Sequence, residues 1–254
     1  MKYTHFLVLS VIVLASCTPP IWNKMQKRAA VVQGIAPDSK YEVLVSGDFA
    51  NWTQNWVEES EVAAQIQYLK EDSCLDIVAS KGLTLWYKTP FQDNLTIRYQ
   101  IRAVVRSEPT DRCSDLNCFW MASDPLHPDS LFARKDFRGG LFSKYYSLSL
   151  YYVGFGGNGN TTTRFRRYDG KYESFLNSKE RPLIQKEYTD PKHLIKPNHW
   201  YSVLIYVKDG VVQYWSDNEL FSNFQDPEPL TKGWFGFRTT QNHLQIRHFS
   251  VSKP

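Results

Sequence analysis

The sequence has no long run of lysine and arginine. Its 254 residues include 30 basic and 26 acidic side chains, so the formal net charge is only +4. A nucleic-acid-binding domain usually gathers its basic residues on one stripe or patch, and scattered positive charge suits an acidic small substrate or glycan equally well. We therefore expect no nucleic-acid partner.

The sequence also lacks the short motifs that mark several large enzyme classes. It has no Gly-x-Ser-x-Gly elbow, no phosphate-binding Walker loop and no His-Glu-x-x-His helix. No second cysteine or histidine pair has the spacing of zinc ligands. We expect neither a metal nor another cofactor.

Cysteine is scarce, and the first of the four cysteines lies in an N-terminal targeting pattern. Lys2 precedes an apolar run at residues 6–14, which is too short to span a membrane and is typical of a secretory signal. The run ends in Leu-Ala-Ser-Cys17, which resembles a bacterial lipobox and implies cleavage before Cys17 and lipid attachment to it. The pattern predicts a signal peptide at 1–16, a tether at 17–35 and one domain at 36–254. It also predicts a lipid-anchored protein in the periplasm or at the cell surface.

The three other cysteines are Cys74, Cys113 and Cys118. In an oxidising compartment, one disulfide and one leftover thiol are expected. Cys113 and Cys118 bracket a four-residue segment, and we predict that they form the disulfide. Cys74 begins an apolar run and is predicted to be buried.

Helix signals are few, and strand signals are frequent. Residues 95–105 alternate between apolar and polar side chains, as a half-buried antiparallel strand does. Hairpins are predicted at 75–87 and 200–215, the second turning at Asp209-Gly210, and the last two strands at 234–238 and 244–251. The pattern predicts an all-β fold, an antiparallel sandwich of two curved sheets in one domain.

Residues 145–168 read as two strands joined by a turn rich in glycine and asparagine. Alternation places Arg164, Arg166 and Tyr168 on one face of the second strand and Phe165 on the other. Arginine pairs hold carboxylates and sulfates well. The stretch predicts a site for an acidic carbohydrate, with arginines that simply coat an exposed sheet face as the alternative.

A long segment, 122–140, carries two prolines and ends in Gly-Gly. Loops of this length are often functional. His127 in this loop is a candidate acid or base, and an exposed loop histidine without a role is the alternative.

The end of the chain resembles a known family. The segments KGWFGFR (232–238) and IRHFSV (246–251), with the hairpin that turns at Asp209-Gly210, resemble concanavalin A-like jelly rolls. The wider pattern is similar to a bacterial family found in loci for uronic acid-containing polysaccharides, one member of which is an ulvan oligosaccharide dehydratase. The resemblance implies a β-jelly roll whose concave sheet holds a glycan.

The resemblance further implies a reaction: loss of water across C4 and C5 of a non-reducing-end uronic acid. This elimination needs a group that neutralises the carboxylate, a base and an acid, and arginines can supply the first without a metal. The predicted catalytic residues are His127, Tyr146, Tyr152, Arg164 and Arg166. The predicted substrate-binding residues are Asn158, Asn160, Tyr168 and His243. A tyrosine base would need cations that lower its pKa.

Two other functions stay open. One is a lipid-anchored carbohydrate-binding protein without activity, and the other is a jelly-roll polysaccharide lyase or glycoside hydrolase. The Glu-x-Asp-x-x-Glu pattern of jelly-roll glucanases is missing, which argues against ordinary hydrolysis. The expected partners are an acidic oligosaccharide and, through Cys17, a membrane. We expect a monomer.

Overall fold

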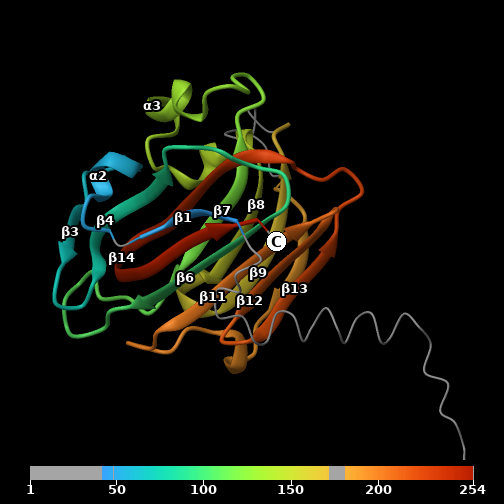
Figure 1. The fold of residues 1–254 in the computed structure, drawn as a ribbon. Helices are drawn as coiled ribbons and strands as arrows, with labels where there is room; N and C mark the ends of the chain where they lie inside the picture. Colours follow the sequence, from blue (N-terminus) through green and yellow to red (C-terminus); the bar gives the residue numbers. More distant parts are fainter. Residues whose placement is uncertain (1–41, 48, 172–180, 254) are drawn as a thin grey trace, which may run out of the picture. The chain divides into compact units, whose positions relative to one another are not determined.

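A computed structural model describes residues 42–47, 49–171 and 181–253, which belong to one compact unit at Tyr41–Pro254 (Figure 1). The predicted signal peptide, the lipidated Cys17 and the tether lie outside the described residues. Within the described ranges, none of the helices combines the length and apolarity needed to cross a bilayer.

The described chain is built from antiparallel strands and a few short helical segments. The strands are β1 (Val43–Ser46), β2 (Trp56–Ser60), β3 (Gln65–Leu69), β4 (Cys74–Tyr87), β5 (Phe91–Gln92), β6 (Leu95–Ala103), β7 (Asn117–Ser123), β8 (Ser149–Gly156), β9 (Thr162–Asp169), β10 (Ile184–Tyr188), β11 (Tyr201–Lys208), β12 (Val211–Ser216), β13 (Glu219–Gln225) and β14 (Lys232–Ser252). The helical segments are α2 (Trp52–Asn55), η1 (Leu131–Arg134), α3 (Lys135–Arg138), η2 (Phe142–Ser147), α4 (Gly157–Asn160) and η4 (Pro191–His193).

The strands form two layers. The front sheet runs β10-β9-β8-β7, then the first half of β14, the second half of β4 and β2. The back sheet runs β13-β12-β11-β6, then the second half of β14, the first half of β4 and β3. The predicted antiparallel sandwich is confirmed.

Strands β4 and β14 pass from one sheet into the other, which the sequence did not predict. The expected hairpin at 75–87 is wrong, because β4 is one continuous strand, and the expected pair of final strands is the single strand β14. Both strands bend together, where the register shifts between Thr240 and Asn242. Gly82 lies at this bend, and a Cβ there would be 2.3 Å from the Gly140 carbonyl oxygen. The glycine therefore permits a close backbone approach rather than a reversal.

The main core lies between the sheets, and the alternation predicted for β9 is confirmed. Phe165 belongs to this core, whereas Tyr168 belongs to a second apolar cluster on the other side of the front sheet. The side of the front sheet that faces away from the back sheet is called the outer face below.

The second cluster is covered by the segment 124–147, called the cover segment. Its η1, α3 and η2 replace the open loop that the sequence predicted, and its Leu131 and Tyr145 pack with Phe119 of β7 and Trp86 of β4. The outer face is therefore partly a buried interface, and only part of it can hold a ligand.

All three described cysteines are free thiols, so the predicted Cys113–Cys118 disulfide is not formed. Cys118 is fully buried in the main core on β7, and burial raises its pKa to about 12. The Cys113 Sγ atom lies instead 3.4 Å from the Ile195 carbonyl oxygen. A buried thiol with a raised pKa is poorly reactive. The expected burial of Cys74 is confirmed.

Candidate functional site

The strand register sets a row of polar residues across the outer face. Arg164 of β9 pairs with Gly154 of β8, and Arg238 of β14 pairs with Asn117 of β7 on one side and with Thr84 of β4 on the other. Cys118 pairs with Val153, so Asn117 and Gly154 are neighbours in the same ladder. The small Gly154 leaves room in this polar row for the side chain of Tyr152.

An aromatic row lies next to the polar row. Arg166 pairs with Tyr152, and Tyr152 pairs with Phe119. From η2, Tyr146 places its ring 5.6 Å from that of Tyr168. The residues at the junction of the two rows are called the outer-face cluster: Asp115, Asn117, Tyr146, Tyr152, Arg166 and Arg238.

Arg238 is a buried cation at the centre of this cluster. Its side chain is 2% exposed and donates to the carbonyl oxygen of Gly140 at 2.6 Å and to the Thr240 hydroxyl at 3.2 Å. Its Nε atom is buried without a partner, and no carboxylate forms an ion pair with it in the described part of the chain. The Glu61 carboxylate lies nearby without forming an ion pair: its Oε1 and the Arg238 Nη2 are 2.4 and 2.7 Å from the position that a Cβ at Gly82 would take. A buried cation that no carboxylate contacts directly is costly. Such a cation is therefore the kind of group that an anionic ligand would complete.

Sequence reasoning missed Arg238. The available signal was its place in the Trp234–Arg238 run, where alternate residues face the apolar core. Trp234, Gly236 and Arg238 alternate with the core residues and so face outward. A charged side chain at the last of these positions indicates a polar site on that face. Nothing in the sequence showed that β7 and β8 would lie next to it.

The hydroxyl of Tyr152 lies over Gly154. A Cβ atom at Gly154 would be 2.5 Å from that hydroxyl, so glycine makes room for it. Next in the ladder, the Asn117 amide donates to Asp115 at 3.2 Å, while the other Asp115 oxygen accepts from Ser114 at 2.9 Å. The side-chain amide oxygen of Asn117, Oδ1, is buried without a hydrogen-bond partner. The cluster thus combines a phenol, a carboxylate and a cation.

The condition for a tyrosine base, a pKa lowered by nearby cations, is not met at Tyr146 or Tyr152. Burial raises the pKa of Tyr152 and of Tyr146, and the charge of Arg166 offsets this only in part. Their phenols stay protonated near neutral pH and can act as proton donors. Tyr168 is fully buried beneath Tyr146, so a direct substrate contact is excluded by its burial.

The two predicted clamp arginines differ in their partners. Arg164 forms an ion pair with Glu187 of β10, which already neutralises its charge. Arg166 donates to the Pro182 carbonyl oxygen and faces the tyrosines. The shared face was predicted, but only Arg166 keeps a charge that no described carboxylate neutralises.

Asn158 and Asn160 build the turn between β8 and β9. Both adopt positive φ angles, 53° and 63°. The Asn158 amide donates to Thr162 at 3.1 Å, and the amide of Asn160 both donates to and accepts from the Ile195 backbone at 2.8 Å. These amides stabilise the turn, and the role of both residues in substrate binding stays a prediction.

His127 is exposed on a tight turn in which its backbone N–H donates to the Asp124 carbonyl oxygen at 2.9 Å. Among the described residues, no hydrogen bond or ion pair connects its ring to the outer-face cluster. Its catalytic role stays a prediction.

His243 lies on the half of β14 that belongs to the back sheet, away from the arginine row. Its ring nitrogens contact Asp76 at 2.9 Å and Asp111 at 3.0 Å. The hydrogen bond with Asp76 raises the pKa of His243, although burial opposes this shift. The prediction that it binds the same substrate is corrected, because both ring nitrogens have structural partners.

The His243 contacts predict a pH-dependent stability. A raised pKa means that the stabilising effect is complete below the ordinary range of histidine and is lost as the pH rises through the folded value. We expect His243→Gln to lower the melting temperature by on the order of 2–4 °C at about pH 6 and much less at about pH 9. Thermal unfolding of both proteins across this range measures the difference, and a difference that grew with pH would contradict the assignment.

Comparison with known proteins identifies the sequence family and the fold. A family model described as "Domain of unknown function (DUF6250)" matches residues 77–249. No curated protein sequence matches the chain significantly.

Several solved structures share the fold at low sequence identity. A Bacillus subtilis protein of unknown function with a galectin-like fold has 16% identity and a TM-score of 0.64, covering 84% of this chain and 98% of its own. An endo-β-1,3-glucanase from Pyrococcus furiosus has 10% identity and a TM-score of 0.54, covering 86% and 97%. The carbohydrate-binding module CBM66 from Bacillus subtilis has 11% identity and a TM-score of 0.50, covering 78% and 96%. At these identities the matches show the jelly-roll fold alone.

Proposed function

Because the chain belongs to the DUF6250 family, whose members are domains of unknown function, we infer its role from the site itself and propose that it binds an acidic oligosaccharide on the outer face of the front sheet. The observation that carries the proposal is Arg238, a buried cation with no carboxylate partner among the described residues. The glucanase and the carbohydrate-binding module that share the fold add support for a carbohydrate ligand.

The residues of the cluster suit a sugar acid. Arg238 and Arg166 can hold a carboxylate through charge-assisted hydrogen bonds, which are about twice as strong as neutral ones. The ring of Tyr146 is partly exposed beside them and offers an apolar surface to a sugar ring. Neutral glycans would leave Arg238 without a direct carboxylate contact.

We further propose elimination of water from the uronic acid at the non-reducing end. A base removes the proton on C5, the C–H electrons form the C4=C5 double bond, and the C4–O bond breaks. The leaving 4-hydroxyl accepts a proton and departs as water. Negative charge that develops on the carboxylate in this step would be stabilised by Arg238 and Arg166.

The raised pKa of Tyr152 and the hydrogen bonds of Asp115 suggest roles within the proposed reaction. Tyr152 is protonated because burial raises its pKa, and it would donate the proton to the leaving hydroxyl. Asp115 is the carboxylate of the cluster, oriented by Asn117 and Ser114, and it would act as the base. Asp115 would then release the proton taken from C5 to solvent, and Tyr152 would take up a proton from solvent, which restores both groups for the next turnover.

The test uses ulvan-type oligosaccharides that carry a non-reducing-end uronic acid. Formation of a 4,5-unsaturated uronate is followed by its ultraviolet absorbance, and chain length by mass spectrometry. A rise in absorbance with loss of one water and no shortening supports the dehydratase, whereas a rise with shortening indicates a polysaccharide lyase. Binding without a rise indicates a carbohydrate-binding protein, and neither binding nor a rise overturns the proposal.

The non-catalytic alternative has an observation in its favour. Tyr152 is only 7% exposed beneath the cover segment, which limits the room for a reacting sugar. The match to a carbohydrate-binding module agrees with this alternative.

Replacing Arg166 by alanine is expected to lower kcat/KM for elimination by about 10- to 1,000-fold, because it removes a cation from the reacting carboxylate. Arg164→Ala is the matched control from the same strand face, since the charge of Arg164 is already paired with Glu187. Initial rates of both variants give the comparison. Equal losses in the two variants would remove Arg166 from the site.

A further inference from the structure

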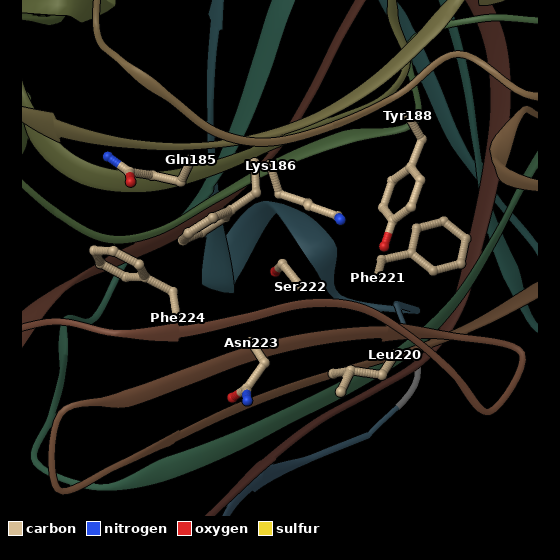
Figure 2. Close-up of a pocket in the computed structure, with 9 residues that line it drawn as sticks. Gln185, Lys186, Tyr188, Leu220, Phe221, Ser222, Asn223 and Phe224 are labelled. Carbon is tan, nitrogen blue, oxygen red and sulfur yellow. The ribbon is translucent and has the colours of Figure 1, made fainter.

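The side of the sandwich opposite the bends of β4 and β14 contains a pocket. It lies between the edge strands β10 and β13, the last strands of the front and back sheets, and has a volume of about 280 Å³. Figure 2 shows side chains of both strands directed into it. Phe165, Tyr188, Phe221 and Phe224 supply its aromatic lining.

A bulge in β10 turns Lys186 toward this pocket. Ile184 pairs with Arg166, but Lys186 pairs with Phe165, so Gln185 is one extra residue in the strand. Paired residues share a face, and Phe165 faces the interior. Regular alternation would have placed Lys186 on the same face as Ile184. The bulge re-aims the side chain of Lys186, which stays exposed, toward the edge of the pocket.

A second bulge, in β13, turns a hydroxyl into the same pocket. Trp215 pairs with Leu220 and Tyr214 with Ser222, so Phe221 is the extra residue. Phe221 and Ser222 therefore both point inward. Ser222 is 5% exposed, and its hydroxyl oxygen is buried without a partner. An unsatisfied buried hydroxyl in a pocket is a group that a ligand can satisfy.

The charge of Lys186 is available to a ligand. Its ammonium lies 4.8 Å from the centre of the Tyr188 ring, and Figure 2 shows the Lys186 side chain directed toward that ring. No carboxylate forms an ion pair with it in the described ranges. The neighbouring Glu187 is bound by Arg164 on the other face of β10. The pocket thus combines one free cation, one free hydroxyl and several aromatic rings.

We propose that this edge pocket is a second binding site, which takes one acidic pyranose unit. The sugar carboxylate contacts Lys186, a ring hydroxyl bonds Ser222, and the apolar ring face packs on Phe224. The volume is near the lower limit of small-molecule pockets, which fits one sugar ring rather than a chain. The ligand class rests on the proposed function, but the site is separate from the outer-face cluster because Phe165, Phe221 and Ser222 in its lining face the interior of the sandwich.

The test titrates D-glucuronate into the full chain and measures binding by ligand-observed saturation-transfer NMR. Lys186→Gln is expected to weaken glucuronate binding by about tenfold, because a charge-assisted contact is lost. Ser222→Ala is expected to weaken it by a smaller factor, and D-glucose is expected to bind more weakly than glucuronate. Lys232→Gln, which removes an exposed lysine away from the pocket, is the charge-matched control and should bind as the unmodified protein does.

The outcomes separate this inference from the proposed function. Loss of glucuronate binding in Arg166→Ala but not in Lys186→Gln overturns the edge pocket and leaves the outer-face proposal intact. No detectable glucuronate binding, or equal effects of Lys186→Gln and Lys232→Gln, also overturns it. Tighter binding of benzoate than of glucuronate overturns the sugar as ligand. Phe224→Ala is a further variant and should also weaken glucuronate binding. A melting curve checks that this variant is folded.

Discussion

Replacing Arg138 by alanine is expected to destabilise the domain by about 3–5 kcal/mol, because it strips a buried ion-pair network of its central cation. Arg138 is fully buried in α3 and binds Glu59 of β2 through two contacts, at 2.9 and 3.0 Å. It also contacts Asp124 at 3.5 Å and the Leu131 carbonyl oxygen at 2.7 Å. Alanine would leave two carboxylates buried next to a cavity. Urea unfolding measures the change in the free energy of unfolding.

The control for Arg138 is its neighbour Lys135, whose ion pair with Asp136 is exposed. Surface pairs contribute between about 0 and 1 kcal/mol, so Lys135→Ala should change stability little. A loss below about 1 kcal/mol in Arg138→Ala would mean that the cover segment does not depend on the network.

Replacing Tyr152 by phenylalanine is expected to lower the rate of elimination by about 100- to 10,000-fold, because it removes the proposed proton donor while keeping the ring. Oligosaccharide binding should persist, since the cations and the aromatic surface remain. Steady-state kinetics and calorimetric binding give the two quantities. The raised pKa of Tyr152 also means that its deprotonation adds no loss of rate in the neutral range.

Tyr151 supplies the matched control, because it precedes Tyr152 in β8 and points to the other face. Its hydroxyl donates to Asp226 at 2.6 Å and accepts from the Leu230 backbone at 3.1 Å. Tyr151→Phe should cost about 1–3 kcal/mol of stability and leave elimination nearly unchanged. If Tyr152→Phe retained full activity, the proton donor would have to be another group.

Local patterns in the sequence predicted much of the fold. Period-two alternation identified β6 and the facing of β9, and Asp209-Gly210 identified the hairpin of β11 and β12. The alternation pattern gave the wrong prediction for β4 and β14. A polar stretch between two apolar runs is compatible both with a turn that reverses the chain and with a strand that bends into a second sheet. The backbone pairing that decides between them involves residues far apart in the chain.

The candidate site was harder to predict than the fold. Tyr146, Tyr152 and Arg166 were predicted because they lie close together in the sequence, on or next to β8 and β9. Arg238 comes from a strand some 70 residues later, and Asp115 comes from the loop before β7. The raised pKa values of Tyr146 and Tyr152 also have a cause that the sequence does not reveal. Burial under the cover segment outweighs the nearby arginine charge, and burial depends on a segment whose fold gives no periodic signal.

The continuity of β4 and β14 makes the two margins of the sandwich mechanically unequal. Where these strands turn the corner, the layers share a backbone and cannot part without breaking main-chain hydrogen bonds. At the far margin, β10 and β13 end their sheets, and no strand of the described residues links them. The double layer therefore has a hinged side and a free side, and any widening between its layers must be greatest at the free side.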